Sequence, residues 1–256
     1  MMGAKVKTNH EKGSTVPVKH DRKVRLLLWG GAATPSDNYT FEHAKNNVLR
    51  DYKAQDKSKF ILGVKRIYVA KDIVRIINSQ ETDGIQSLDV WTHGGPQALY
   101  LTTADPPPPE DAWWIRKKAY ETNRWVLHNS SLYRTRTRMI FNAAGWTEGS
   151  ALVDEIDFSK FSQNARVELH GCATAANPSD ADNIAADISK KLALAGKTKS
   201  FVIGHIENAD PLIKGKGKTS APEQDYRFGD RAIFKHGKLV SITKKHGDFS
   251  GKELEK

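Results

Sequence analysis

The chain has 256 residues, a formal net charge of +10 and a hydrophobic fraction of 38%. This length suits a single α/β domain, and no window approaches the roughly 20 apolar residues that a membrane-spanning helix needs. The first twenty residues lack the apolar stretch of a secretory signal, and the single cysteine excludes an internal disulfide framework. We therefore expect no transmembrane segment, and a location that is cytoplasmic or secreted without a cleavable signal peptide.

The first ninety residues alternate apolar runs with amphipathic stretches, after a charged segment at 1–22 that predicts a flexible basic tail. The expected strands are 24–29, 64–70 and 85–92, and the expected helices are 41–52, capped by Thr40, and 72–78. The order strand, helix, strand, helix, strand is typical of a parallel sheet with helices packed on its faces.

The regular pattern breaks after His93, where 97–102 predicts a short strand and a long insertion follows at about 103–165. The insertion holds a basic cluster interleaved with tryptophans: Arg116, Lys117, Lys118, Arg124, Arg134, Arg136 and Arg138. Because basic groups neutralise phosphates and aromatic rings stack on bases, this surface could bind a polyanion such as nucleic acid. The other interpretation is a flap that covers a protein interface or the active site.

The pattern resumes with a strand at 166–170, a helix at 179–195 that Gly196 ends, and a strand at 200–204. Residues 231–243 predict a hairpin that turns at His236 and Gly237. The sequence therefore predicts one α/β domain over 23–243, with a mostly parallel sheet flanked by helices, a C-terminal hairpin, and a polar tail at 244–256.

Two of the expected strands end at a reactive side chain beside glycine. His93 follows one strand and precedes Gly94, and Cys172 follows another strand and Gly171. The carboxyl ends of neighbouring parallel strands meet in one crevice, so these positions predict a cysteine nucleophile with a histidine acid/base partner. The structural alternatives are a buried core cysteine and a loop histidine that bonds the backbone.

The blocks LDVWTHG at 88–94 and VELHGC at 167–172 resemble the caspase-like (clan CD) cysteine peptidases, which include caspases, gingipains and self-cleaving domains of bacterial toxins. The resemblance implies a caspase-like three-layer sandwich and a cysteine endopeptidase acting on a protein or peptide substrate. It implies that His93 is the general acid/base, Cys172 the nucleophile, and the amides of Gly94 and Cys172 the oxyanion hole. The Gln-Ala-Cys-x-Gly pattern of true caspases is absent, which favours a divergent bacterial type, such as an effector or toxin-processing domain.

The same resemblance implies that no cofactor is required, although an inositol polyphosphate activates toxin domains of this group. Lys214, Lys216, Lys218 and the final hairpin are where such an activator would bind. The alternative function is a non-catalytic binding module on the same fold, which engages a polyanion or partner protein through the basic insertion. The sequence does not indicate the oligomeric state.

Four further residues are candidates for accessory or orienting roles. Strand alternation places His170 on the side of Cys172, where it could tune the thiolate or simply pack. His205 follows the strand at 200–204, and Asp210, like Asp89, could orient a catalytic histidine. Short ligand pairs with a usual metal spacing are absent, so the sequence predicts no metal site.

Overall fold

The computed structural model describes residues 22–32, 34–101, 125–128, 151–249 and 254. The basic cluster of the insertion at 116–138 and all but the last residue of the tail at 1–22 lie outside the described residues. Within the described ranges, no helix combines the length and the apolar character needed to cross a membrane.

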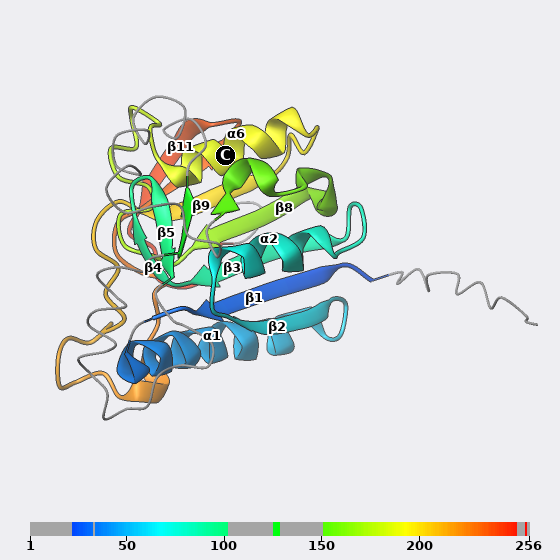
Figure 1. The fold of residues 1–256 in the computed structure, drawn as a ribbon. Helices are drawn as coiled ribbons and strands as arrows, with labels where there is room; N and C mark the ends of the chain where they lie inside the picture. Colours follow the sequence, from blue (N-terminus) through cyan, green and yellow to red (C-terminus); the bar gives the residue numbers. More distant parts are fainter. Residues whose placement is uncertain (1–21, 33, 102–124, 129–150, 250–253, 255–256) are drawn as a thin grey trace, which may run out of the picture.

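A seven-stranded sheet forms the centre of the fold, with the order β11-β10-β9-β8-β3-β1-β2 (Figure 1). Its strands are β1 (Val24–Gly30), β2 (Ile61–Ile67), β3 (Ile85–Trp91), β8 (Phe161–Leu169), β9 (Phe201–His205), β10 (Arg231–Lys235) and β11 (Lys238–Thr243). The first five are parallel, and β10 runs antiparallel to β9 and pairs with β11. The prediction of a mostly parallel α/β sheet with a C-terminal hairpin is confirmed.

The chain crosses from one half of the sheet to the other between β1 and β3. After β2 pairs on one side of β1, β3 pairs on the other side and the later strands add outward. Such a switch point leaves a crevice at the carboxyl ends of the strands, where the connecting loops diverge. A small second sheet starts at this edge, with β4 (His93–Gly95), β5 (Ala98–Leu101), β6 (Trp125–His128) and β7 (Ala151–Leu152) in sequence order.

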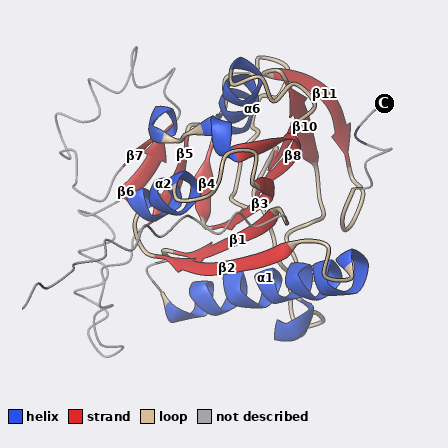
Figure 2. Cartoon of the chain, turned by 90° about the vertical axis from the view of Figure 1, so that its right-hand side faces the viewer, coloured by secondary structure: helices blue, strands red, loops and turns tan. Residues whose placement is uncertain are grey.

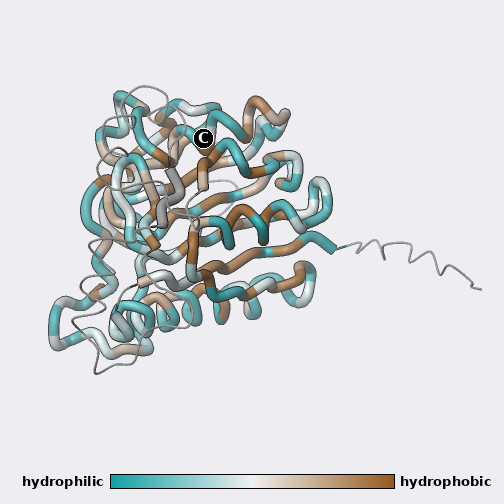
Figure 3. Tube along the Cα trace, in the orientation of Figure 1, coloured by the Kyte–Doolittle hydropathy of each residue, from teal (hydrophilic) through white to brown (hydrophobic). Residues whose placement is uncertain are grey.

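Helices cover both faces of the large sheet (Figure 2). The helices are α1 (Pro35–Asp56), α2 (Ala70–Asn78) and α6 (Ile184–Leu194), and the short 3-10 turns are η1 (Val153–Glu155), η2 (Phe158–Lys160) and η3 (Ala221–Glu223). Side chains alternate between the faces along each strand, so Leu26 and Leu28 share a core cluster with residues of α2 and α6, whereas Leu27 shares one with residues of α1. The apolar residues accordingly concentrate along the central strands (Figure 3).

Several element boundaries differ from the prediction because local caps set them. Helix α1 begins at Pro35 with Thr34 as its N-cap, since Thr34 Oγ1 accepts from the Asp37 amide at 3.2 Å, whereas Thr40 lies inside the helix. Asn183 caps α6 in the same way through the Ala186 amide at 2.9 Å, so this helix does not begin at Ser179.

Two strands also lie elsewhere than expected, since tertiary pairing fixes them. Strand β2 is shifted toward the amino terminus because Ile61 pairs with Val24 of β1. Strand β8 begins at Phe161, so the last residues assigned to the insertion belong to the sheet. The hairpin turn is at His236 and Gly237 as predicted, both with positive φ, 55° and 74°, as a type I′ turn requires.

The segment after β11, expected to be a polar tail, returns to the sheet. Phe249 and Leu254 are buried in one cluster with Phe201, Ile203 and Ile233. These strand residues lie on the face that α1 covers further along the sheet. The C-terminal segment therefore completes the layer that α1 begins.

Candidate active site

The structure brings the His93 and Cys172 turns together at the carboxyl edge of the sheet. A Cβ atom added to Gly94 would lie 2.9 Å from the Cys172 carbonyl oxygen, and one added to Gly171 would lie 3.0 Å from the Gly94 Cα. Because a real Cβ atom does not come this close to other backbone atoms, both positions require glycine. The two strand ends therefore meet, and the glycines beside both reactive residues allow the backbones to approach this closely.

A carboxylate from α1 orients His93. Asp37 lies in the first turn of this helix, and its Oδ2 is 3.3 Å from His93 Nε2. The hydrogen bond with His93 holds the pKa of Asp37 below its ordinary value, although burial opposes this. Phe41, one helical turn later, packs edge-on against the imidazole with 5.4 Å between ring centroids. Because Nε2 faces Asp37, the nitrogen left to face a substrate is Nδ1.

Cys172 lies on a tightly held turn. Its thiol is partly buried, with Sγ 3.9 Å from the Ala209 carbonyl oxygen. Ala173 adopts a left-handed conformation with φ of 53°, which costs a residue with a side chain about 1 kcal/mol or more. Its amide donates to the Glu207 carbonyl at 2.7 Å, which holds this conformation, whereas the Cys172 amide has no acceptor among the described residues.

Tyr226 lies beside the same site, where it packs against Phe41 with 6.0 Å between ring centroids. Burial raises the pKa of Tyr226, and charge at Cys172, Asp37 and Asp210 raises it further. Tyr226 is therefore close enough to interact with all three groups. The carboxylate that contacts His93 is Asp37, and not Asp210 or Asp89 as predicted. Asp210 accepts from the Leu212 amide at 2.8 Å, and Asp89 pairs with His170.

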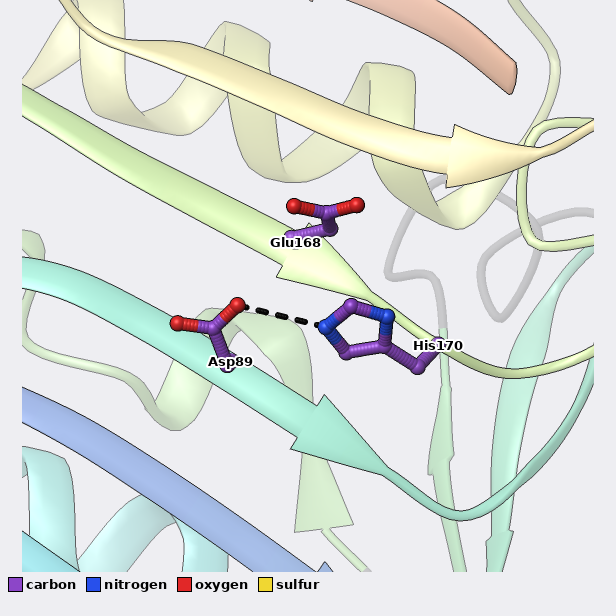
Figure 4. Close-up of side chains that lie close together, drawn as sticks. All are labelled: Asp89, Glu168 and His170. Carbon is purple, nitrogen blue, oxygen red and sulfur yellow. Dashed lines mark hydrogen bonds and ion pairs between the residues drawn. The ribbon is translucent and has the colours of Figure 1, made fainter. Parts of the chain in front are cut away.

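His170 and His205 are packed residues and do not face the crevice. His170 is fully buried, stacks on Trp91 with 4.4 Å between ring centroids, and pairs through Nε2 with Asp89 Oδ1 at 3.2 Å (Figure 4). His205 is 3% exposed, and burial, followed by the neighbouring His170 and Arg231, lowers its pKa to about 3. The packing interpretation of His170 is confirmed, and the accessory role expected of His205 at the substrate has no support in these contacts.

Asp37 and Tyr226 are the site residues that the sequence analysis missed. A signal for Asp37 was present, because β1 borders the switch point and a carboxylate in the first turn after β1 lies beside the end of β3. Tyr226 carries no such signal, since it lies between η3 and β10, outside any regular element.

The arrangement brings together groups that acyl transfer uses, next to the partly exposed side chains of His93 and Asp37. It offers a thiol, an imidazole oriented by a carboxylate, and a main-chain amide beside the thiol. No protein-family model matches the chain, and no curated protein sequence matches it. The function is therefore inferred from these residues and their geometry.

Proposed function

We propose that the chain is a cysteine endopeptidase with a caspase-like fold, in which Cys172 and His93 form the catalytic dyad. The contact of Gly94 with Gly171 and Cys172 carries the proposal, because it joins two strand ends that lie almost eighty residues apart in the sequence. The parallel strand order, with its switch point beside β3, supports the caspase-like fold.

In the proposed reaction His93 takes the proton of the Cys172 thiol, and the thiolate attacks the scissile carbonyl carbon so that a C–S bond forms. The amides of Gly94 and Cys172 stabilise the oxyanion of the tetrahedral intermediate. The C–N bond then breaks as His93 gives a proton to the leaving amine. Water next attacks the acyl-enzyme with His93 as the base, which releases the carboxylic acid and restores the thiol.

Asp37 supports this chemistry by positioning His93. A carboxylate that accepts from Nε2–H fixes one imidazole tautomer and stabilises the imidazolium that forms during the reaction. Both side chains remain accessible, with 38% of His93 and 44% of Asp37 exposed. A substrate can therefore reach the His93 ring without a prior rearrangement of the fold.

Labelling with a thiol-reactive peptide electrophile tests the proposal, with intact-mass spectrometry as the readout. The wild-type chain should gain one adduct, and only at Cys172, since the chain has a single cysteine. The Cys172→Ala variant should gain none, and His93→Ala should react more slowly by about 10²-fold or more. The labelling is run with and without inositol hexakisphosphate, the class of activator that the family resemblance implies.

Iodoacetamide provides the control, because it reports exposure of the thiol without requiring a peptide-binding crevice. The peptidase proposal would be contradicted if the folded protein reacted no faster with the peptide electrophile than the urea-unfolded protein does, both with and without inositol hexakisphosphate. Salt-dependent binding of a polyanion without labelling or turnover would instead favour the binding module, whose basic residues lie outside the described part of the chain.

A further inference from the structure

Thr174 is a fully buried residue in the turn that joins β8 to α6, two positions after Cys172. The proposed reaction does not use its side chain. A buried hydroxyl needs hydrogen-bond partners, and a β-branched side chain has few rotamers, so the contacts of both branches are tightly defined. Each branch of Thr174 contacts a different segment around the proposed dyad.

The hydroxyl of Thr174 ties the Cys172 turn to the end of β9. Its Oγ1 lies 3.1 Å from the Gly171 carbonyl oxygen and 3.3 Å from that of Leu169, so its one proton can be donated to either. The same oxygen accepts from the His205 amide at 3.2 Å. One side chain therefore bonds main-chain groups at the ends of two adjacent strands, β8 and β9.

The main chain on both sides of Thr174 bonds to the same end of β9. The Ala173 amide donates to the Glu207 carbonyl at 2.7 Å, and the Ala175 amide donates to the His205 carbonyl at 2.8 Å. Three consecutive residues therefore hold the turn on this segment. Thr174 makes the middle link, and it does so through its side chain.

The methyl group of Thr174 packs against the His93 turn. A Cβ atom added to Gly94 would lie 2.9 Å from Thr174 Cγ2, which is closer than carbon atoms pack, so the methyl group occupies the space beside this glycine. A Cβ atom added to Gly204 of β9 would lie 2.8 Å from Thr174 Oγ1. Two glycines from different strands therefore make room for the two branches of one threonine.

We propose that Thr174 is a positioning residue, which sets the Cys172 turn against the His93 turn. Its hydroxyl holds the Cys172 turn on β9, and its methyl group sets how closely Gly94 approaches that turn. The inference rests on the proposed peptidase, because such placement matters only if the thiol and the imidazole act together. Reaction rates are sensitive to this placement, since a displacement of about 1 Å can cost about 10²-fold.

Two substitutions separate the two branches, with labelling of Cys172 by the peptide electrophile as the readout. Thr174→Val keeps the shape of the side chain and removes the hydroxyl, so we expect labelling to slow by about tenfold or more. Thr174→Ser keeps the hydrogen bonds and leaves a methyl-sized gap beside Gly94. We expect this variant to retain more of the rate, with a loss of about two- to fivefold.

The same substitution in the His93→Ala background distinguishes positioning from a general loss of structure. Thr174→Val should slow labelling by less than about twofold once His93 is absent, because no imidazole is left to align. Equal slowing in both backgrounds, or wild-type labelling by both Thr174 variants, would overturn the inference and leave the dyad in place. A His93→Ala rate equal to that of the wild type would instead overturn the dyad, and the inference with it. If Thr174→Val does not fold, Thr174→Ser decides by the same comparison.

Ser200→Ala is the matched control, because Ser200 is also buried and also joins β8 to β9. It lies at the amino end of β9, where its Oγ accepts from the Ala165 amide at 3.1 Å and is 3.4 Å from the Gln163 carbonyl oxygen. Its loss should lower the urea midpoint, since the Ala165 amide loses its partner, and should leave the labelling rate unchanged. Slowing by Ser200→Ala as large as that by Thr174→Val would overturn the positioning role.

Discussion

Two regions of the molecule use the same residue types in different ways. One is the crevice around His93 and Asp37. The other is the buried layer beneath it, which holds charged and histidine side chains: Asp89, Arg166, Glu168, His170, His205 and Arg231. In the crevice, His93 and Asp37 are each more than one-third exposed and pair at 3.3 Å. In the layer, His170 and Asp89 make a similar pair at 3.2 Å with both side chains fully buried. Solvent screens the first pair, so it contributes little to stability and remains available for chemistry. The second pair is surrounded by charges that the fold must balance, so changes there should affect stability before they affect activity.

The largest expected effect is on stability, from Arg231→Met in the buried layer. Arg231 is fully buried, pairs with Glu168, and donates to the carbonyls of Lys245 at 2.5 Å and Gly247 at 3.1 Å. The substitution leaves a buried carboxylate without its partner and releases the C-terminal segment. We expect a loss of about 3–5 kcal/mol in the free energy of unfolding, measured by urea denaturation.

The partner variant separates lost charge balance from lost packing. The double variant Arg231→Met with Glu168→Leu removes both charges, so it should recover much of the lost stability. Lys244→Met is the matched control, because Lys244 forms an exposed ion pair with Asp230 at 3.4 Å and should cost no more than about 0.5 kcal/mol. A loss below about 1 kcal/mol for Arg231→Met would show that the layer is not tightly balanced.

A smaller effect is expected from pH, through His205. Its pKa is about 3 in the folded protein and 6.5 ordinarily, so between these values the unfolded chain binds more protons. Stability should therefore be fully present above about pH 6.5 and fall toward pH 3, with a slope of up to about 1.4 kcal/mol per pH unit. Urea midpoints from neutral to acid pH would measure this slope.

Two histidine variants assign the slope. His205→Asn should remove one proton's share of the pH dependence, whereas His236→Asn, at the exposed hairpin turn, should keep it. An unchanged slope in His205→Asn would place the acid sensitivity elsewhere in the buried layer. The buried layer and the crevice would then differ only in how exposed their side chains are to solvent.

The sequence predicted the sheet and the dyad because both leave a local pattern. Apolar runs followed by glycine marked the ends of β3 and β8, and the same glycines marked the contact between Gly94 and Gly171. The start of β2 could not be predicted in this way. Its apolar residues run on past both ends, and only pairing with β1 sets the register.

The buried layer could not be predicted because its partners are distant in the sequence. Arg166, Glu168 and His170 alternate with apolar residues, a pattern that also fits a strand with one solvent face. In the fold all three are buried, and Tyr52 of α1 and Asp248 of the C-terminal segment both bond Arg166.

The smallest expected change in the free energy of unfolding comes from Asp37→Asn in the crevice. This variant is nevertheless the most direct test of the difference between the exposed and the buried His–Asp pair. The amide can no longer accept and stabilise charge as the carboxylate does, so His93 loses its preferred tautomer. We expect the labelling rate to fall about tenfold, equivalent to about 1.4 kcal/mol, while the free energy of unfolding changes by about 0.5 kcal/mol. Mass spectrometry of samples quenched at successive times measures the labelling rate, and urea denaturation measures the free energy of unfolding.

Asp72→Asn is the matched control for Asp37→Asn. Asp72 also lies in the first turn of a helix, where it accepts from the Tyr68 and Val69 amides at 2.9 and 3.2 Å, but it does not contact the crevice. Its substitution should cost stability and leave the labelling rate unchanged. Asp37→Asn with wild-type labelling would mean that His93 keeps its orientation through Phe41 alone. The Asp37 carboxylate would then stabilise only the start of α1, and His93 would need no charged partner.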